Sequence, residues 1–63
     1  MVQEEDILER MAQEIIEENP ETVQKIKAGR LEAVNFLVGQ AMKRTKGQAN
    51  AKLMRRIFMQ KLS

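Results

Sequence analysis

A turn that contains Gly47 is surrounded by basic side chains. A helical pattern ends just before it, where the helix dipole favours cations, and another begins near Asn50, where backbone N–H groups lack partners within the helix. Both ends suit an anion such as phosphate, although cations near a helix end also serve as ordinary capping groups. The basic residues are Lys43, Arg44, Lys46, Lys52 and Arg56.

Catalytic chemistry is hard to build from the rest of the chain. The absence of cysteine and histidine excludes the usual structural zinc sites and Cys/His nucleophile pairs. Carboxylates cluster on one predicted solvated helix face, where a general acid and base would have no cleft. No second glycine precedes Lys46 at the spacing of a phosphate-binding loop. We expect no enzyme, no catalytic residue and no metal site in this chain alone.

Charge is divided along the sequence, although the net charge is only +2. Residues 1–21 contain eight acids and one base, whereas residues 22–63 contain ten bases and one acid. This division favours an anionic partner for the second part. The charge division is explained equally well by an acidic helix that neutralises the basic part within the fold.

A nucleic acid bound here would be held mainly through its phosphates, and the affinity would fall steeply with salt. Contact with about four phosphates predicts a log-log salt slope of roughly −3 to −4. The chain has no tyrosine or tryptophan, which disfavours base-stacking platforms and favours recognition of the shape of a folded RNA.

Apolar residues recur at helical spacing in four segments, which predicts an all-α fold, a compact bundle of four short helices. The helices are expected at about residues 4–18, 20–28, 30–45 and 50–62, in a single domain spanning residues 1–63. Asn19 and Asn50 are predicted N-caps, and Gly29 and Gly47 are predicted helix stops. The inward residues are Ile7, Leu8, Met11, Ala12, Ile15, Ile16, Val23, Ile26, Leu31, Val34, Leu37, Val38, Ala41, Met42, Leu53, Met54, Ile57, Phe58 and Leu62.

Phe36 lies about 160° from Val38 around the third helix, with Gly39 near it. The favoured interpretation is that this second face packs against another helix. Glycine has no side chain, so it would let that helix approach closely. The alternative is an exposed aromatic contact to a partner or a base. On the last helix we expect Lys52, Arg55, Arg56, Met59 and Gln60 on the outer face.

Apolar runs such as Phe36–Val38 are at most three residues long, far shorter than the roughly 20 residues that span a bilayer. Acids at Glu4, Glu5 and Asp6 replace the basic head of a signal peptide. We expect a cytoplasmic protein with no membrane partner.

Four ordered segments carry a family resemblance: Asn19-Pro20-Glu21, Ala28-Gly29-Arg30, Phe36-Leu37-Val38-Gly39-Gln40 with Met42-Lys43, and Thr45-Lys46-Gly47-Gln48-Ala49-Asn50. They resemble the carboxy-terminal tail of the B subunit (GatB) of aspartyl/glutamyl-tRNA amidotransferase. Stand-alone relatives share the Lys-Gly turn, but the Phe-Leu-Val-Gly-Gln segment favours the amidotransferase. Ala51 stands where many members have proline, and Arg55, Arg56, Phe58 and Met59 also depart from the family pattern.

The resemblance implies a tRNA-binding tail domain, excised from a larger catalytic subunit, that grips the outer corner of the tRNA near the D-loop. The parent complex converts misacylated Glu-tRNA(Gln) or Asp-tRNA(Asn) to the amide form, with ATP, Mg²⁺ and glutamine used elsewhere and with A and C subunits as partners. The tail itself would need no cofactor. Carried over to this sequence, the tRNA-contacting residues are Lys43, Arg44, Lys46, Gly47, Gln48, Asn50, Lys52 and Arg56.

Two other functions remain open. A protein-interaction module would dock on the catalytic domain or another partner through Phe36 and Met59. A helix-turn-helix DNA-binding protein would read DNA with its last helix, but the sequence shows no dimer face for it.

Overall fold

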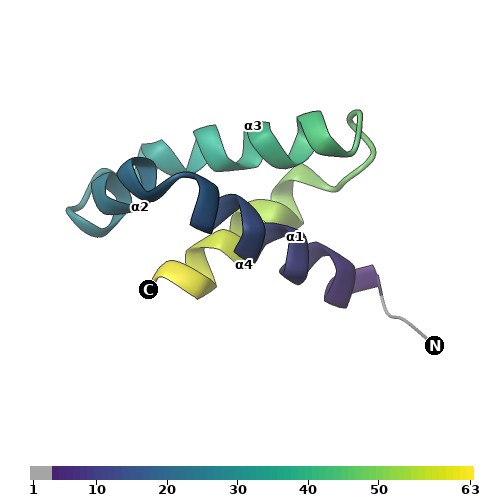
Figure 1. The fold of residues 1–63 in the computed structure, drawn as a ribbon, viewed down its shortest axis with the longest axis horizontal. Coiled ribbons are helices and arrows are strands. Elements are labelled where there is room, and N and C mark those ends of the chain that lie inside the picture. The colour runs from purple at the N-terminus through teal and green to yellow at the C-terminus, as the bar shows by residue number, and fades with distance from the viewer. Residues whose placement is uncertain (1–3) are drawn as a thin grey trace.

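Four α-helices and one turn of 3-10 helix make up residues 4–63, the part of the chain that the computed structural model describes (Figure 1). They are α1 (Glu4–Glu18), α2 (Pro20–Lys27), η1 (Leu31–Ala33), α3 (Val34–Arg44) and α4 (Ala51–Leu62). In Figure 1, α3 forms the upper edge, α1 and α4 lie below it, and α2 lies beside its start. This range contains no strand, so the prediction of an all-α fold is confirmed.

Most of the predicted inward residues form one core shared by all four helices. Phe58, Ile15, Leu37 and Met54 are its largest fully buried side chains. Two apolar predictions are wrong, because the Ile7 side chain is 56% exposed and that of Leu31 is 54% exposed. Met59, predicted to face outward, is half-buried and packs against the core.

The junction between α1 and α2 differs from the predicted cap. Pro20 is the first residue of α2, as expected, but the Asn19 side chain makes no capping hydrogen bond to that helix. Its Nδ2 instead donates to the Ile15 carbonyl at 2.8 Å. Asn19 therefore satisfies a carbonyl at the end of α1, where the last four have no partner within the helix.

Gly29 ends α2, as predicted. Its φ of +109° lies in a region that glycine enters without a Cβ clash. Its N–H donates to the Ile26 carbonyl at 3.0 Å, and the Arg30 N–H donates to that of Lys25 at 2.9 Å, the pair of bonds that defines a Schellman motif. The chain then makes the η1 turn, so α3 begins at Val34 rather than near residue 30.

The outer side of α3 is uncovered within residues 4–63, so the prediction that Phe36 and Gly39 pack against another helix is wrong. The Phe36 side chain is 52% exposed. A Cβ placed on Gly39 would meet no other group within 4 Å. Among the four α-helices of the described residues, the neighbours of α3 all lie on its inner side (Figure 1).

None of the helices in residues 4–63 combines the length and the apolar character needed to cross a membrane.

Candidate nucleic-acid interface

The turn between α3 and α4 begins with Lys46 in a left-handed conformation. The φ of Lys46 is +55°, and Gly47 follows with +80°. The Gly47 N–H donates to the Met42 carbonyl at 2.8 Å, and the Lys46 N–H donates to that of Lys43 at 3.3 Å. This is a second Schellman motif, and its left-handed residue is the lysine. The prediction that Gly47 itself stops the helix is therefore one residue late.

Thr45 fixes the path of this turn. Its Oγ1 donates to the Ala41 carbonyl at 3.0 Å and accepts from the Ala49 N–H at 3.1 Å. The Gln48 N–H also donates to the Thr45 carbonyl at 3.1 Å. The turn is thus tied at both ends while its tip remains in solvent.

Asn50 caps α4, as predicted. Its Oδ1 accepts from the Leu53 N–H at 3.1 Å, and its backbone is extended, with φ −78° and ψ 111°. The amides of the next residues point out from the helix start, which is the arrangement that favours an anion.

Six of the eight predicted contact residues lie exposed together at this end of the molecule, at the turn or one helical turn away from it (Figure 1). The lysine turn, as we name it, consists of Lys43, Lys46 and Lys52 with the backbone of residues 45–50. The three lysines are exposed and lie in the last turn of α3, in the turn itself and at the start of α4. The six residues are Lys43, Lys46, Gly47, Gln48, Asn50 and Lys52.

Arg44 is drawn away from this group toward α1. Its two guanidinium nitrogens donate to Glu14 Oε1 and Glu18 Oε2, both at 2.7 Å. The hydrogen bond with Glu14, together with the charges of both carboxylates, raises the pKa of Arg44 above its ordinary value. Part of the acidic helix thus neutralises a base within the fold, as the second explanation of the charge division expects.

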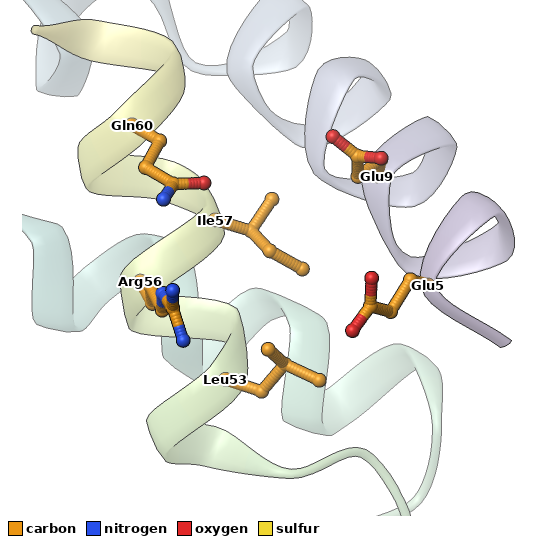
Figure 2. A pocket seen from close by; sticks show the side chains of 6 residues that line it. All are labelled: Glu5, Glu9, Leu53, Arg56, Ile57 and Gln60. Carbon is orange, nitrogen blue, oxygen red and sulfur yellow. The ribbon is translucent and has the colours of Figure 1, made fainter.

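Arg56 also lies apart, in a groove of about 160 Å³ between α1 and α4. Figure 2 shows it on α4, with Glu5 and Glu9 across the groove on α1. Leu53, Ile57 and Gln60 complete the lining. Arg56 therefore lines the same groove as two carboxylates, which lower the local positive potential.

The sequence did not reveal how Arg55 is held. Its guanidinium donates to Asn35 Oδ1 on α3. Helical spacing correctly places Arg55 on an exposed side of α4, but this partner depends on how α3 and α4 pack. Thr45 was likewise not among the predicted site residues, although a threonine in the last turn of a helix can bond to the carbonyl four residues earlier.

Comparison with known proteins identifies the family. The family model described as the GatB domain matches residues 1–62. The chain belongs to the GatB domain family. A protein of Methanopyrus kandleri is 43% identical over 97% of this chain, and one of Caldanaerobacter subterraneus is 44% identical over 98%. A third, from Pediococcus pentosaceus, is 49% identical over 90%. All three bear the name of the B subunit of aspartyl/glutamyl-tRNA(Asn/Gln) amidotransferase.

This GatB domain spans only about an eighth of its relatives, 13% of the first two and 12% of the third. No solved structure matches the chain significantly. The four segments that carry the family resemblance occupy the α1–α2 junction, the end of α2, the body of α3 and the lysine turn. Within the described residues, no group of histidine, cysteine, aspartate or glutamate side chains is arranged to hold a metal ion.

Proposed function

We propose that this GatB domain binds tRNA through the lysine turn. The observation that carries the proposal is the left-handed backbone of Lys46. A non-glycine residue there is disfavoured by roughly 1–2 kcal/mol, and such conformations cluster at functional sites. Glycine at this position would relieve the strain. The presence of lysine there instead points to a function of its ammonium group in binding an anion.

Electrostatics supports a phosphate backbone as that anion. Arg44 is paired with Glu14 and Glu18, and Arg56 lines a groove together with Glu5 and Glu9. Lys43, Lys46 and Lys52 remain exposed around the turn. Three lysines predict a log-log salt slope of roughly −2 to −3, shallower than the slope expected from the sequence alone.

The name that the relatives bear supports a role for this interface in a larger reaction. We propose that the chain is the tail domain of an amidotransferase B subunit, which grips the outer corner of tRNA(Gln) or tRNA(Asn) near the D-loop. It would present the misacylated tRNA to a catalytic portion that uses ATP and Mg²⁺, in a cytoplasmic complex with the A and C subunits. The tail would contribute binding and no catalytic group.

Mobility-shift titration of the 63-residue chain with transcripts of both tRNAs tests the proposal. Lys46→Glu and Lys52→Glu should each weaken binding by roughly tenfold or more, because each loses one phosphate contact and adds a repulsive charge. Lys27→Glu is the matched control, since it changes the net charge equally at the end of α2 (Figure 1).

Equal losses for Lys27→Glu and Lys46→Glu would contradict a localised interface. If the chain binds duplex DNA of equal charge as tightly as it binds tRNA, that result would contradict tRNA recognition. Sequence-specific binding of the duplex would instead support the helix-turn-helix alternative.

The protein-docking alternative keeps only part of its predicted surface. Phe36 is 52% exposed, as that function requires, but Met59 packs against the core. If Phe36 docks on the catalytic domain, Phe36→Ala should abolish that association while Lys46→Glu and Lys52→Glu leave it intact.

A further inference from the structure

The exposed face of α3 combines an aromatic ring, a bare stretch of backbone and a lysine. Phe36, Gly39 and Lys43 follow one another at spacings of three and four residues, which aligns them along one side of a helix. All three are exposed. The row ends at Lys43, which belongs to the lysine turn, so this face is continuous with the proposed RNA interface.

The surroundings of Phe36 determine which ligand this face suits. Phe36 lines a hollow of about 360 Å³ whose other walls come from the α1–α2 junction. Two carboxylates, Glu18 and Glu21, lie in that lining, and Glu18 is already paired with Arg44. A phosphate would be repelled on this side, whereas a neutral base can stack on the ring and donate its amino groups to carboxylate oxygens. The other residues that line the hollow are Asn19, Pro20 and Thr22.

Gly39 shows that the approach to this face is open. A Cβ at this position would meet nothing within 4 Å, so internal packing does not require glycine. Glycine inside a helix nevertheless lowers stability relative to other residues. A glycine without a packing reason, one turn from an exposed aromatic ring, fits a ligand that lies close to the backbone.

We infer that the Phe36 face binds a single unpaired nucleotide of the RNA, with its base stacked on the Phe36 ring and across Gly39 and its phosphate held by Lys43. This inference rests on the proposed function. It adds base stacking to an interface in which the absence of tyrosine and tryptophan favoured recognition of RNA shape, and it takes up the base contact that the sequence left open for Phe36.

A thermodynamic cycle tests the stacking contact. Its probes are an RNA hairpin with an unpaired loop and the same hairpin with abasic loop positions, which carry equal charge. Loss of the bases should weaken binding to the unmodified chain by roughly 5- to 100-fold, the range for base stacking on an aromatic side chain. Phe36→Ala should weaken binding to the intact hairpin by a similar factor, and the variant should no longer distinguish the two hairpins.

Ile7→Ala is the matched control, because Ile7 is also a large exposed apolar residue, at 56%, but lies on α1. It should leave both affinities unchanged. Proton NMR supplies a direct readout, since the chain has two phenylalanines and Phe58 is fully buried. The ring protons of Phe36 should move upfield on addition of the intact hairpin and stay in place with the abasic one.

Gly39→Gln separates a functional glycine from a structural one. It should raise the thermal midpoint by roughly 4–8 °C, because glutamine is a better helix former and meets no clash, and it should weaken binding of the intact hairpin. A higher midpoint with unchanged binding would overturn the role given to Gly39.

The result that overturns the inference is distinct from failure of the proposed function. If Lys46→Glu weakens RNA binding but Phe36→Ala and the abasic loop have no effect, the lysine turn binds RNA without a stacked base, and the Phe36 face is free for a protein partner. If the lysine variants also have no effect, both proposals fail.

Discussion

Lys46 occupies a backbone conformation that glycine adopts more easily than lysine. The Schellman motif that ends α3 requires a left-handed residue at this position, and Gly47 follows it rather than filling it. Lys46 is also exposed in the turn that connects the end of α3, where Lys43 lies, to the start of α4, where Lys52 lies. Strain and charge therefore coincide in one residue, as is common where function limits stability.

Lys46→Gly should raise stability and lower RNA affinity together. Removal of the left-handed strain, partly offset by the greater freedom of glycine in the unfolded chain, should raise the free energy of unfolding by about 0.5–1 kcal/mol. Urea denaturation measures this change, and tRNA titration measures the loss of one phosphate contact. Gly47→Ala is the control, because a Cβ at a φ of +80° should lower stability by roughly 1–2 kcal/mol. A less stable Lys46→Gly variant would show that the lysine is not strained.

The start of α4 has a side-chain cap, but its first helical residue is not the type that best suits a helix start. Asn50 caps the helix and has an extended backbone, which is the conformation that proline requires of the residue before it. Ala51 is the first helical residue, where proline costs no hydrogen bond and its fixed φ suits the helix.

Ala51→Pro should therefore stabilise the domain without altering its surface charge. We expect the free energy of unfolding to rise by about 0.4–1 kcal/mol, chiefly through a less flexible unfolded chain. Thermal unfolding followed by circular dichroism measures it, with Lys52→Pro as the control one position later. Similar stabilisation by both variants would mean that the cap does not set the first residue of α4.

Helical periodicity predicted most of the elements, and short-range chemistry predicted some of their ends. The bounds of α1 and the caps at Gly29 and Asn50 depend on residues a few positions apart, so the sequence contains them. The side chain of Asn19 had two possible partners, and the angle between α1 and α2 selects the Ile15 carbonyl. Local sequence does not determine that angle.

Longer-range packing decided what the sequence left open about the candidate site. Periodicity placed Phe36 opposite Val38, but only the number and placement of the other helices show that its face is uncovered. Arg44 and Lys43 are adjacent and both basic, yet only Arg44 reaches carboxylates of α1, 26 and 30 residues away in sequence. The sequence thus predicted which cations lie near the candidate site. It did not predict which of them pair with carboxylates and which remain exposed.

The whole molecule has a small core, which makes its stability sensitive to single buried residues. A domain of about 60 residues buries only about 60% of the surface that its unfolded chain exposes, and a core of this size supplies roughly 3–5 kcal/mol. The radius of gyration is 11.0 Å. Phe58 is the largest of the fully buried side chains and packs in the cluster that α1, α2, α3 and α4 share.

Phe58→Ala should leave the domain largely unfolded, whereas Phe36→Ala should leave it folded. Truncation of a buried phenylalanine costs about 3–5 kcal/mol, which equals the whole stability expected of such a core. Phe36 is 52% exposed, so the same substitution there removes little buried surface. Far-ultraviolet circular dichroism at 25 °C measures the helical content of both variants. Equal loss of helix in the two would show that Phe36 is part of the core, and it would remove the basis for assigning its ring to a ligand.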